Sequence, residues 1–259
     1  MIVRQLSECA ALITGSTSGI GLEIAAQLAE AGVSKVMLNG RNPARGEQAR
    51  HQVMQRSPGT EARFLPADLT NQAEAKWLAD ETAAAFGSID ILVTSVSGTL
   101  PPLPFHLIPP DSIDASVRAS FLAPLYICHA ALPHLIEREG GVILNIASDA
   151  GKVATPGEVV IGACKGAVLM MTRTLALEAS RHGIRVHAIS PSIVKDTASY
   201  DRVMASEFSR KLFEKAERRA RLGVPGPGDI ASLAVYLASP AAARMTGQVV
   251  SVNGGISVA

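Results

Sequence analysis

The run T-G-S-T-S-G-I-G at residues 14–21 has the residue types and spacing of a turn that binds the diphosphate of a dinucleotide. Gly15 lets the chain bend sharply because glycine tolerates positive φ, and Gly19 and Gly21 leave room for the diphosphate and the next helix. The N-terminus of that helix offers free N–H groups and a partial positive charge to phosphate. An apolar run at 10–13 precedes the turn, as the strand–turn–helix fingerprint requires. We therefore predict a dinucleotide-binding turn, with a plain glycine loop as the alternative.

The end of the second predicted strand, residues 35–39, lies about 20 residues after this turn, where such folds select their cofactor. An acidic residue there binds the ribose 2′-hydroxyl of NAD and repels the 2′-phosphate of NADP. The sequence at 39–41 is N-G-R, in which Gly40 leaves space and Arg41 can pair with a phosphate. We therefore expect NADP(H) to be favoured over NAD(H). The alternative is that Arg41 is a solvated residue at a strand end.

A second group of candidates follows later strands. Ser148 comes after the predicted strand at 142–146, and Lys165 lies on the predicted helix at 162–179. In parallel sheets, ligands bind beyond the carboxyl ends of the strands. We therefore expect one edge of the sheet to gather six of the candidate positions: Gly15, Gly40, Asp68, Ser95, Ser148 and Pro191.

The elements that must position these residues alternate between apolar strands and helical patterns along the whole chain of 259 residues. That alternation predicts an α/β fold, a single Rossmann-type doubly wound parallel sheet of about seven strands with helices on both faces. We expect one dinucleotide-binding domain over 1–259. The charged helical segment at about 195–221 would form a flap over the site.

Composition narrows the function classes. The formal net charge of +1 gives no sign of a nucleic-acid or membrane-surface partner. Three cysteines without C-x-x-C spacing support neither a disulfide framework nor a zinc site, and we expect no metal. The N-terminus lacks the apolar core of a signal peptide, and we expect that no apolar stretch reaches the ~18 residues of a membrane span. We therefore expect a cytoplasmic protein.

With these motifs, the chain resembles the short-chain dehydrogenase/reductase family over nearly its whole length. The likeness rests on T-G-x-x-x-G-I-G at 14–21, D-L-T at 68–70, Ser148, A-C-K-G-A-V at 163–168, G-I-R-V at 183–186 and T-G-Q-V-V-S-V-N-G-G at 246–255. The resemblance implies oxidoreductase activity with a nicotinamide cofactor. It also implies cofactor contacts from Gly15, Ser16, Ser18, Gly19, Ile20, Gly21, Arg41, Asp68, Leu69, Ser95, Lys165, Pro191 and Ile193.

The resemblance breaks at the proton donor. In that family a tyrosine four residues before the lysine gives or takes the proton, because positions i and i+4 share a helix face and the lysine lowers the pKa of the phenol. Here that position is Ile161, which cannot transfer a proton. The tyrosines at 126, 200 and 236 are distant from Lys165 in sequence, although Tyr200 could enter the site from the flap if it does not simply pack there.

Other family positions are also altered. Ser120 falls where the family has a catalytic asparagine, and His187 replaces an asparagine of the sixth strand. An enoyl-reductase variant places its tyrosine seven residues before the lysine, which here is Glu158. We expect Asp149 and Glu158 to be solvated carboxylates and His187 to be a core histidine with its hydrogen bonds satisfied. Ser148 and Lys165 remain the catalytic candidates.

Two hypotheses follow. One is an NADP(H)-dependent oxidoreductase with an altered active site, which could reduce a C=C bond conjugated to a carbonyl. The other is a catalytically impaired pseudoenzyme that serves as a cofactor-binding or structural subunit beside an active paralogue. The loop at 101–110 carries several apolar side chains, so we expect an apolar or bulky small-molecule substrate. The resemblance implies a homotetramer or dimer, or a hetero-oligomer with a paralogue.

Overall fold

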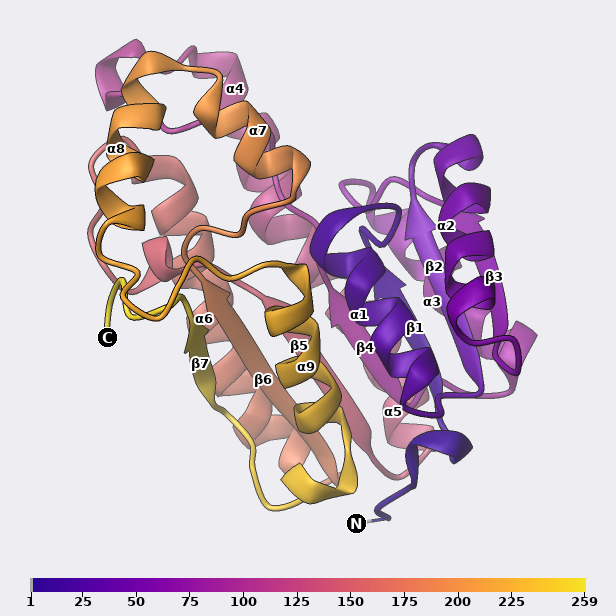
Figure 1. Ribbon diagram of the computed structural model, residues 1–259. Coiled ribbons are helices and arrows are strands. Elements are labelled where there is room, and N and C mark those ends of the chain that lie inside the picture. Colours follow the sequence, from indigo (N-terminus) through magenta and orange to yellow (C-terminus); the bar gives the residue numbers. More distant parts are fainter. Residues whose placement is uncertain (1) are drawn as a thin grey trace.

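The structure, a computed structural model, describes residues 2–259. Within them, seven strands form one parallel sheet in the order β3-β2-β1-β4-β5-β6-β7 (Figure 1). The strands are β1 Ala10–Thr14, β2 Lys35–Gly40, β3 Glu61–Pro66, β4 Ile91–Thr94, β5 Gly141–Ile146, β6 Ile184–Pro191 and β7 Val249–Val252. The predicted fold class is confirmed. The chain leaves β1 to one side and returns to its other side at β4, which creates the switch point where such sheets bind ligands.

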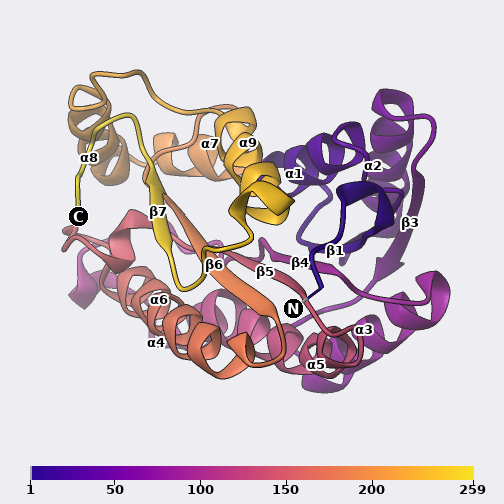
Figure 2. The same ribbon diagram turned by 90° about the horizontal axis from the view of Figure 1, so that it is seen from below.

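Helices cover both faces of the sheet (Figure 2). One face carries α1 Gly19–Glu30, α2 Pro43–Arg56 and α9 Pro227–Ala238, and the other carries α3 Gln72–Phe86, α4 Pro110–Val117, α5 Ala123–Glu137 and α6 Val159–Ser180. The segment predicted as a flap forms two helices, α7 Ala198–Met204 and α8 Glu207–Glu217, which extend past the sheet beside α4 (Figure 1).

The helical stretch Pro110–Glu137 continues through Pro124 and Pro133 without ending. Within it, α4 and α5 are joined by a π-helical turn at Arg118–Leu122, in which the N–H of Ala123 donates to the carbonyl of Arg118. Pro124 explains this turn, because its ring lacks an N–H and would clash with the carbonyl of Ser120 in a regular helix. The helical turn therefore contains one extra residue, and Ser120 lies in this wider turn.

Two helical stretches, Pro110–Glu137 and Val159–Ser180, are long and apolar enough to cross a membrane by length and composition. The expectation that no stretch reaches this length was therefore wrong. Both stretches pack on the sheet, and residues such as Ile127 and Leu135 fill the core between them and the strands. Core helices of a folded domain pass the same test, so these stretches are weak evidence for a membrane.

His187 lies on β6, fully buried under the face covered by α9, and neither ring nitrogen completes a hydrogen bond. Burial, helped by the charge of Arg185, lowers the pKa of His187 to about 4, although the backbone of Met245 acts in the opposite direction. The sequence-based expectation was correct for burial and wrong for satisfied hydrogen bonds. The strand position fixes the ring in the core, where the backbone of Met245 lies near it without completing a hydrogen bond.

This histidine makes the fold sensitive to acid. Because the folded pKa is lower than that of the unfolded chain, protons bind the unfolded state preferentially, and stability falls as pH drops from about 6.5 towards 4. Between pH 7 and 5, the free energy of unfolding of the wild type is expected to fall by about 2 kcal/mol more than that of His187→Leu. Urea unfolding of both proteins at both pH values measures this difference. His129→Gln, at an exposed histidine, is the control, and an equal loss in His187→Leu and wild type would contradict the prediction.

Candidate functional site

The glycine turn forms a tight cradle between β1 and α1. Gly15 has φ of +60°, and a Cβ atom on it would lie 2.5 Å from the carbonyl oxygen of Ser95. A Cβ atom on Gly21 would lie 2.5 Å from the carbonyl oxygen of Gly15. Ser16 is buried, and its hydroxyl donates to the Ile13 carbonyl at 2.7 Å and accepts from the N–H of Asn39 at 3.0 Å. Ser16 therefore fixes the turn against β2, and it does so as a structural residue.

A large cavity opens at the carboxyl ends of β1 to β4. Six predicted cofactor residues line it: Gly15, Ser18, Arg41, Asp68, Leu69 and Ser95. The opposite wall comes from the loop at 96–101 and from residues 112–119 of α4 and the π turn. Sequence reasoning did not single out the residues of that wall as part of the cofactor site. It also missed Thr17, whose methyl group would lie 2.5 Å from a Cβ atom on Gly40. The cradle and the cavity fit a dinucleotide, because side chains at these glycines would fill the space.

Other predicted cofactor residues do not line this cavity. Ile20 packs towards the core, while Pro191, the last residue of β6, and Ile193, just after the strand, are both buried. Gly19 faces the flap, since a Cβ atom on it would lie 3.6 Å from the methyl group of Thr197. Thr197, which caps α7, is a further residue that the sequence did not single out.

Arg41 and Asp68 meet at the mouth of the cavity. The Arg41 guanidinium lies 3.9 Å from the Asp68 carboxylate, and both side chains are exposed, Arg41 by 74%. Asp68 also accepts from the N–H and hydroxyl of Thr70, at 3.0 and 2.8 Å. The carboxylate is therefore held in place, whereas Arg41 is free to turn towards a bound anion.

Ser148 and Lys165 lie together at the end of β5, outside the residues that line the large cavity. Lys165 is only 3% exposed, and its Nζ donates to the carbonyl of Ile146 at 3.0 Å. Burial lowers the pKa of Lys165 to about 8. Ser148 caps the short helical turn that follows β5 by accepting from the N–H of Ala150. Ile161 lies one helical turn before Lys165, on α6.

Ser120 and Tyr200 have structural partners. The Ser120 hydroxyl accepts from the N–H of Gly98 at 3.0 Å and ties the loop after β4 to the π turn. The Tyr200 hydroxyl donates to Glu217 at 2.8 Å, so this tyrosine joins α7 to α8. Of the two alternatives for Tyr200, the structure supports packing within the flap.

Asp149 is buried, which contradicts the expectation of a solvated carboxylate. It accepts from the Ser251 hydroxyl at 3.0 Å, from the Asn253 amide at 2.5 Å and from the Ser257 hydroxyl at 2.8 Å. These partners come from β7 and the segment after it, more than 100 residues away in sequence, and they compensate the charge by hydrogen bonding. Asp149 therefore anchors the loop that carries Ser148.

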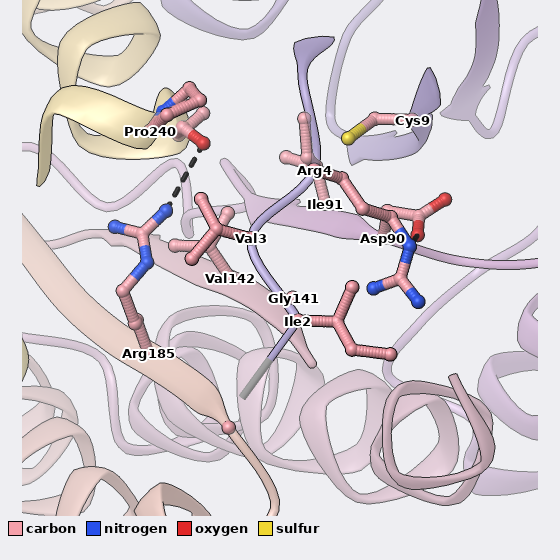
Figure 3. A pocket seen from close by; sticks show the side chains of 12 residues that line it. Ile2, Val3, Arg4, Cys9, Asp90, Ile91, Gly141, Val142, Arg185 and Pro240 are labelled. Carbon is pink, nitrogen blue, oxygen red and sulfur yellow. Dashed lines mark hydrogen bonds and ion pairs between the residues drawn. The ribbon is translucent and has the colours of Figure 1, made fainter. Parts of the chain in front are cut away.

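A second, smaller pocket lies at the opposite edge of the sheet, near the amino ends of the strands (Figure 3). Asp90 pairs there with Arg4 and Arg138, at 3.6 and 2.8 Å. Arg185 donates to the last carbonyls of α9, including that of Ala238 at 3.1 Å. These charged groups are already used to hold the N-terminal segment and α9, so the pocket is structural.

A family model described as enoyl-(acyl carrier protein) reductase matches residues 15–257. A probable 2,4-dienoyl-CoA reductase of Bacillus subtilis is 32% identical over 95% of this chain and 95% of its own length. A short-chain type dehydrogenase/reductase from Mycobacterium ulcerans superposes with a TM-score of 0.89 at 28% identity, covering 98% of this chain and 91% of that one. The chain belongs to the short-chain dehydrogenase/reductase family.

Relatives in this family are oxidoreductases with nicotinamide cofactors. A solved 7α-hydroxysteroid dehydrogenase, in complex with NADH and 7-oxo glycochenodeoxycholic acid, has a TM-score of 0.88 and 29% identity, over 97% of this chain and 95% of that one. Short-chain dehydrogenase/reductase homologues use NAD or NADP.

Proposed function

We propose that this protein is an NADP(H)-dependent reductase of a C=C bond conjugated to a carbonyl in an apolar substrate. The arrangement on α6 carries the proposal, since Lys165 is kept and buried while Ile161 stands where the family has its tyrosine. Reduction of a carbonyl needs a proton on oxygen, which Ile161 cannot provide. Reduction of a conjugated C=C bond places the final proton on carbon, and another group can supply it. The likeness to a probable 2,4-dienoyl-CoA reductase supports this reaction.

The bound nicotinamide cofactor supplies a hydride. The residues of this chain bind and orient the reactants. The Ser148 hydroxyl would donate a hydrogen bond to the substrate carbonyl, which would stabilise the negative charge that develops on that oxygen. The Lys165 ammonium would hydrogen-bond the nicotinamide ribose, because its Nζ has spare donors beyond the bond to Ile146. An assay of NADPH oxidation with enones, enoyl thioesters and ketones tests the proposal, and turnover of ketones alone would contradict it.

Apolar side chains support an apolar substrate. Leu100 and Leu103, from the loop after β4, pack with the buried residues Ile108, Val160 and Cys164. This cluster lies between that loop and the start of α6, which carries Ile161. A site walled by such groups favours an extended hydrocarbon or ring system over a small polar molecule.

Arg41 is the proposed determinant of NADP(H) preference. Arg41→Ala is expected to raise the Kd for NADPH about tenfold, because it removes an exposed charge-assisted contact to the 2′-phosphate. The Kd for NADH should stay within about twofold, since that cofactor lacks the phosphate. Fluorescence titration measures both constants. Arg45→Ala, which removes an exposed arginine that does not line the cavity, is the matched control. An unchanged Kd for NADPH in Arg41→Ala would refute this role.

The second candidate function is a structural subunit beside an active paralogue in the cytoplasm. The outer face of α6 favours association, because Met170 and Leu177 are 59% and 79% exposed there. We propose a dimer or tetramer, of this chain alone or with a paralogue. A homomeric preparation that reduces an enone would rule out the subunit role, whereas co-purification of a tyrosine-bearing relative without activity of the isolated chain would favour it.

A further inference from the structure

Glu158 is the N-cap residue of α6, the helix that carries Ile161 and Lys165. The sequence-based expectation was a solvated carboxylate, and the structure contradicts it, because most of this side chain is withdrawn from water. Two segments far away in the sequence contact its chain neighbour Gly157. Glu158 itself is half-buried, and its carboxyl group is a titratable group that neither cofactor binding nor packing explains.

Three segments meet beside this residue. The carbonyl of Gly157 accepts from the N–H of Leu103 at 2.9 Å, which ties the loop after β4 to the start of α6. On another side, a Cβ atom on Gly157 would lie 2.7 Å from the ring of Phe208, which belongs to flap helix α8. Two residues after Glu158, Val160 is buried in the apolar cluster with Ile108. Glu158 thus stands where the loop, the flap and α6 enclose the proposed substrate region.

This environment keeps the proton on the carboxyl group. Burial raises the pKa of Glu158 to about 7, and Thr155 offsets the effect only in part. Within residues 2–259, no charged side chain contributes to the shift, so no cation holds the carboxylate form. A carboxyl group in this state is half protonated near neutral pH and can give and regain a proton during turnover.

We propose that Glu158 is the acid that protonates the substrate carbon in place of the missing tyrosine. The role rests on the proposed reduction of a conjugated C=C bond. As the hydride adds to the β-carbon and the cofactor is oxidised, the π electrons move towards the carbonyl and form an enolate. The O–H bond of Glu158 then breaks, and its proton forms the new C–H bond at the α-carbon, directly or through one water. The remaining carboxylate regains a proton from solvent.

Position on the helix is compatible with this role. Glu158 precedes Lys165 by seven residues, which is about 10 Å along the helix axis and nearly two full turns. Residues seven apart lie on nearly the same side of a helix, and the N-cap position of Glu158 at the start of α6 is compatible with both side chains serving one site. The lysine would serve the cofactor end of that site, and the carboxyl group the end enclosed by the loop and the flap.

The test compares Glu158→Gln with wild type in NADPH oxidation, using whichever enone or enoyl thioester the wild type reduces best. Wild-type kcat is expected to fall as pH rises through about 7, because only the protonated acid can donate. In Glu158→Gln, kcat should fall at least ~100-fold, and that inflection should disappear. The Kd for NADPH should remain within twofold of wild type, which also verifies that the variant is folded. Glu158→Asp should recover part of the rate together with a pH inflection.

Glu81→Gln, which removes an exposed carboxylate of α3, is the matched control and should leave kcat unchanged. Turnover in Glu158→Gln at the wild-type rate and with the wild-type pH profile would overturn the role of Glu158 while leaving the proposed reduction intact. A wild-type protein that binds NADPH but reduces no acceptor of the panel would overturn both. The two failures are therefore distinguishable.

Discussion

Gly15→Ala is expected to abolish measurable cofactor binding and to destabilise the fold. Gly15 has φ of +60°, and a Cβ atom there would lie 2.5 Å from the carbonyl oxygen of Ser95 and 2.9 Å from its carbonyl carbon. Strain in this backbone region costs roughly 1–3 kcal/mol for a residue other than glycine. The clash is with backbone, which cannot swing away as a flexible side chain can, and overpacking of this kind costs about 1–3 kcal/mol more.

Urea unfolding and NADPH titration measure the two effects of Gly15→Ala. The free energy of unfolding should drop by about 2–6 kcal/mol, and the Kd for NADPH should rise at least ~100-fold, because the turn must move away from both Ser95 and the diphosphate. Gly59→Ala is the matched control, since a Cβ atom on Gly59 would meet nothing within 4 Å. Wild-type stability in Gly15→Ala would show that the turn relaxes without cost.

Ile161→Tyr is expected to give the protein carbonyl reductase activity. The new phenol would lie one helical turn before Lys165, whose ammonium would lower the pKa of the phenol towards neutral pH. A positioned general acid contributes about 100- to 10,000-fold, so ketone reduction should rise at least ~100-fold above wild type. NADPH oxidation with a panel of apolar ketones measures the gain.

Ile161→Phe is the control for Ile161→Tyr, because it adds the same ring without the hydroxyl. Ketone reduction that appears with both aromatic residues would attribute the gain to packing. No gain in Ile161→Tyr, with NADPH bound normally, would show that the altered positions at Ser120 and His187 matter as much as the missing phenol.

Much of the fold could be predicted because its signals are local. Glycine-rich turns, proline at helix starts and short apolar runs lie within a few residues of one another, and Asn42 caps α2 just as its type predicts. The rule that strand ends of a parallel sheet share one edge then brought Gly15, Arg41, Asp68 and Ser95 to one cavity. These residues need no long-range information beyond the order of the strands.

The carboxylates could not be predicted, because burial depends on contacts distant in sequence. Asp149 is satisfied by Ser251 and Asn253, and Glu158 follows Gly157, which contacts the loop and the flap. Residue type alone favours solvent for both. The π turn was missed for a related reason, because Pro124 indicates a disturbed helix without showing whether the helix stops or widens.

The position of β1 in the middle of the sheet also affects how the chain folds. β1 pairs with β2 on one side and with β4 on the other, and the N–H of Ala10 donates to the Asp90 carboxylate at 2.9 Å. A chain growing on the ribosome therefore cannot complete the neighbourhood of its first strand until β4 has emerged. Closing such distant parallel pairs costs entropy before their contacts form, which makes folding of this kind of sheet slow. During that interval the apolar edges of β1 and β2 are exposed to aggregation, so we expect yields of folded protein to improve at low synthesis rates.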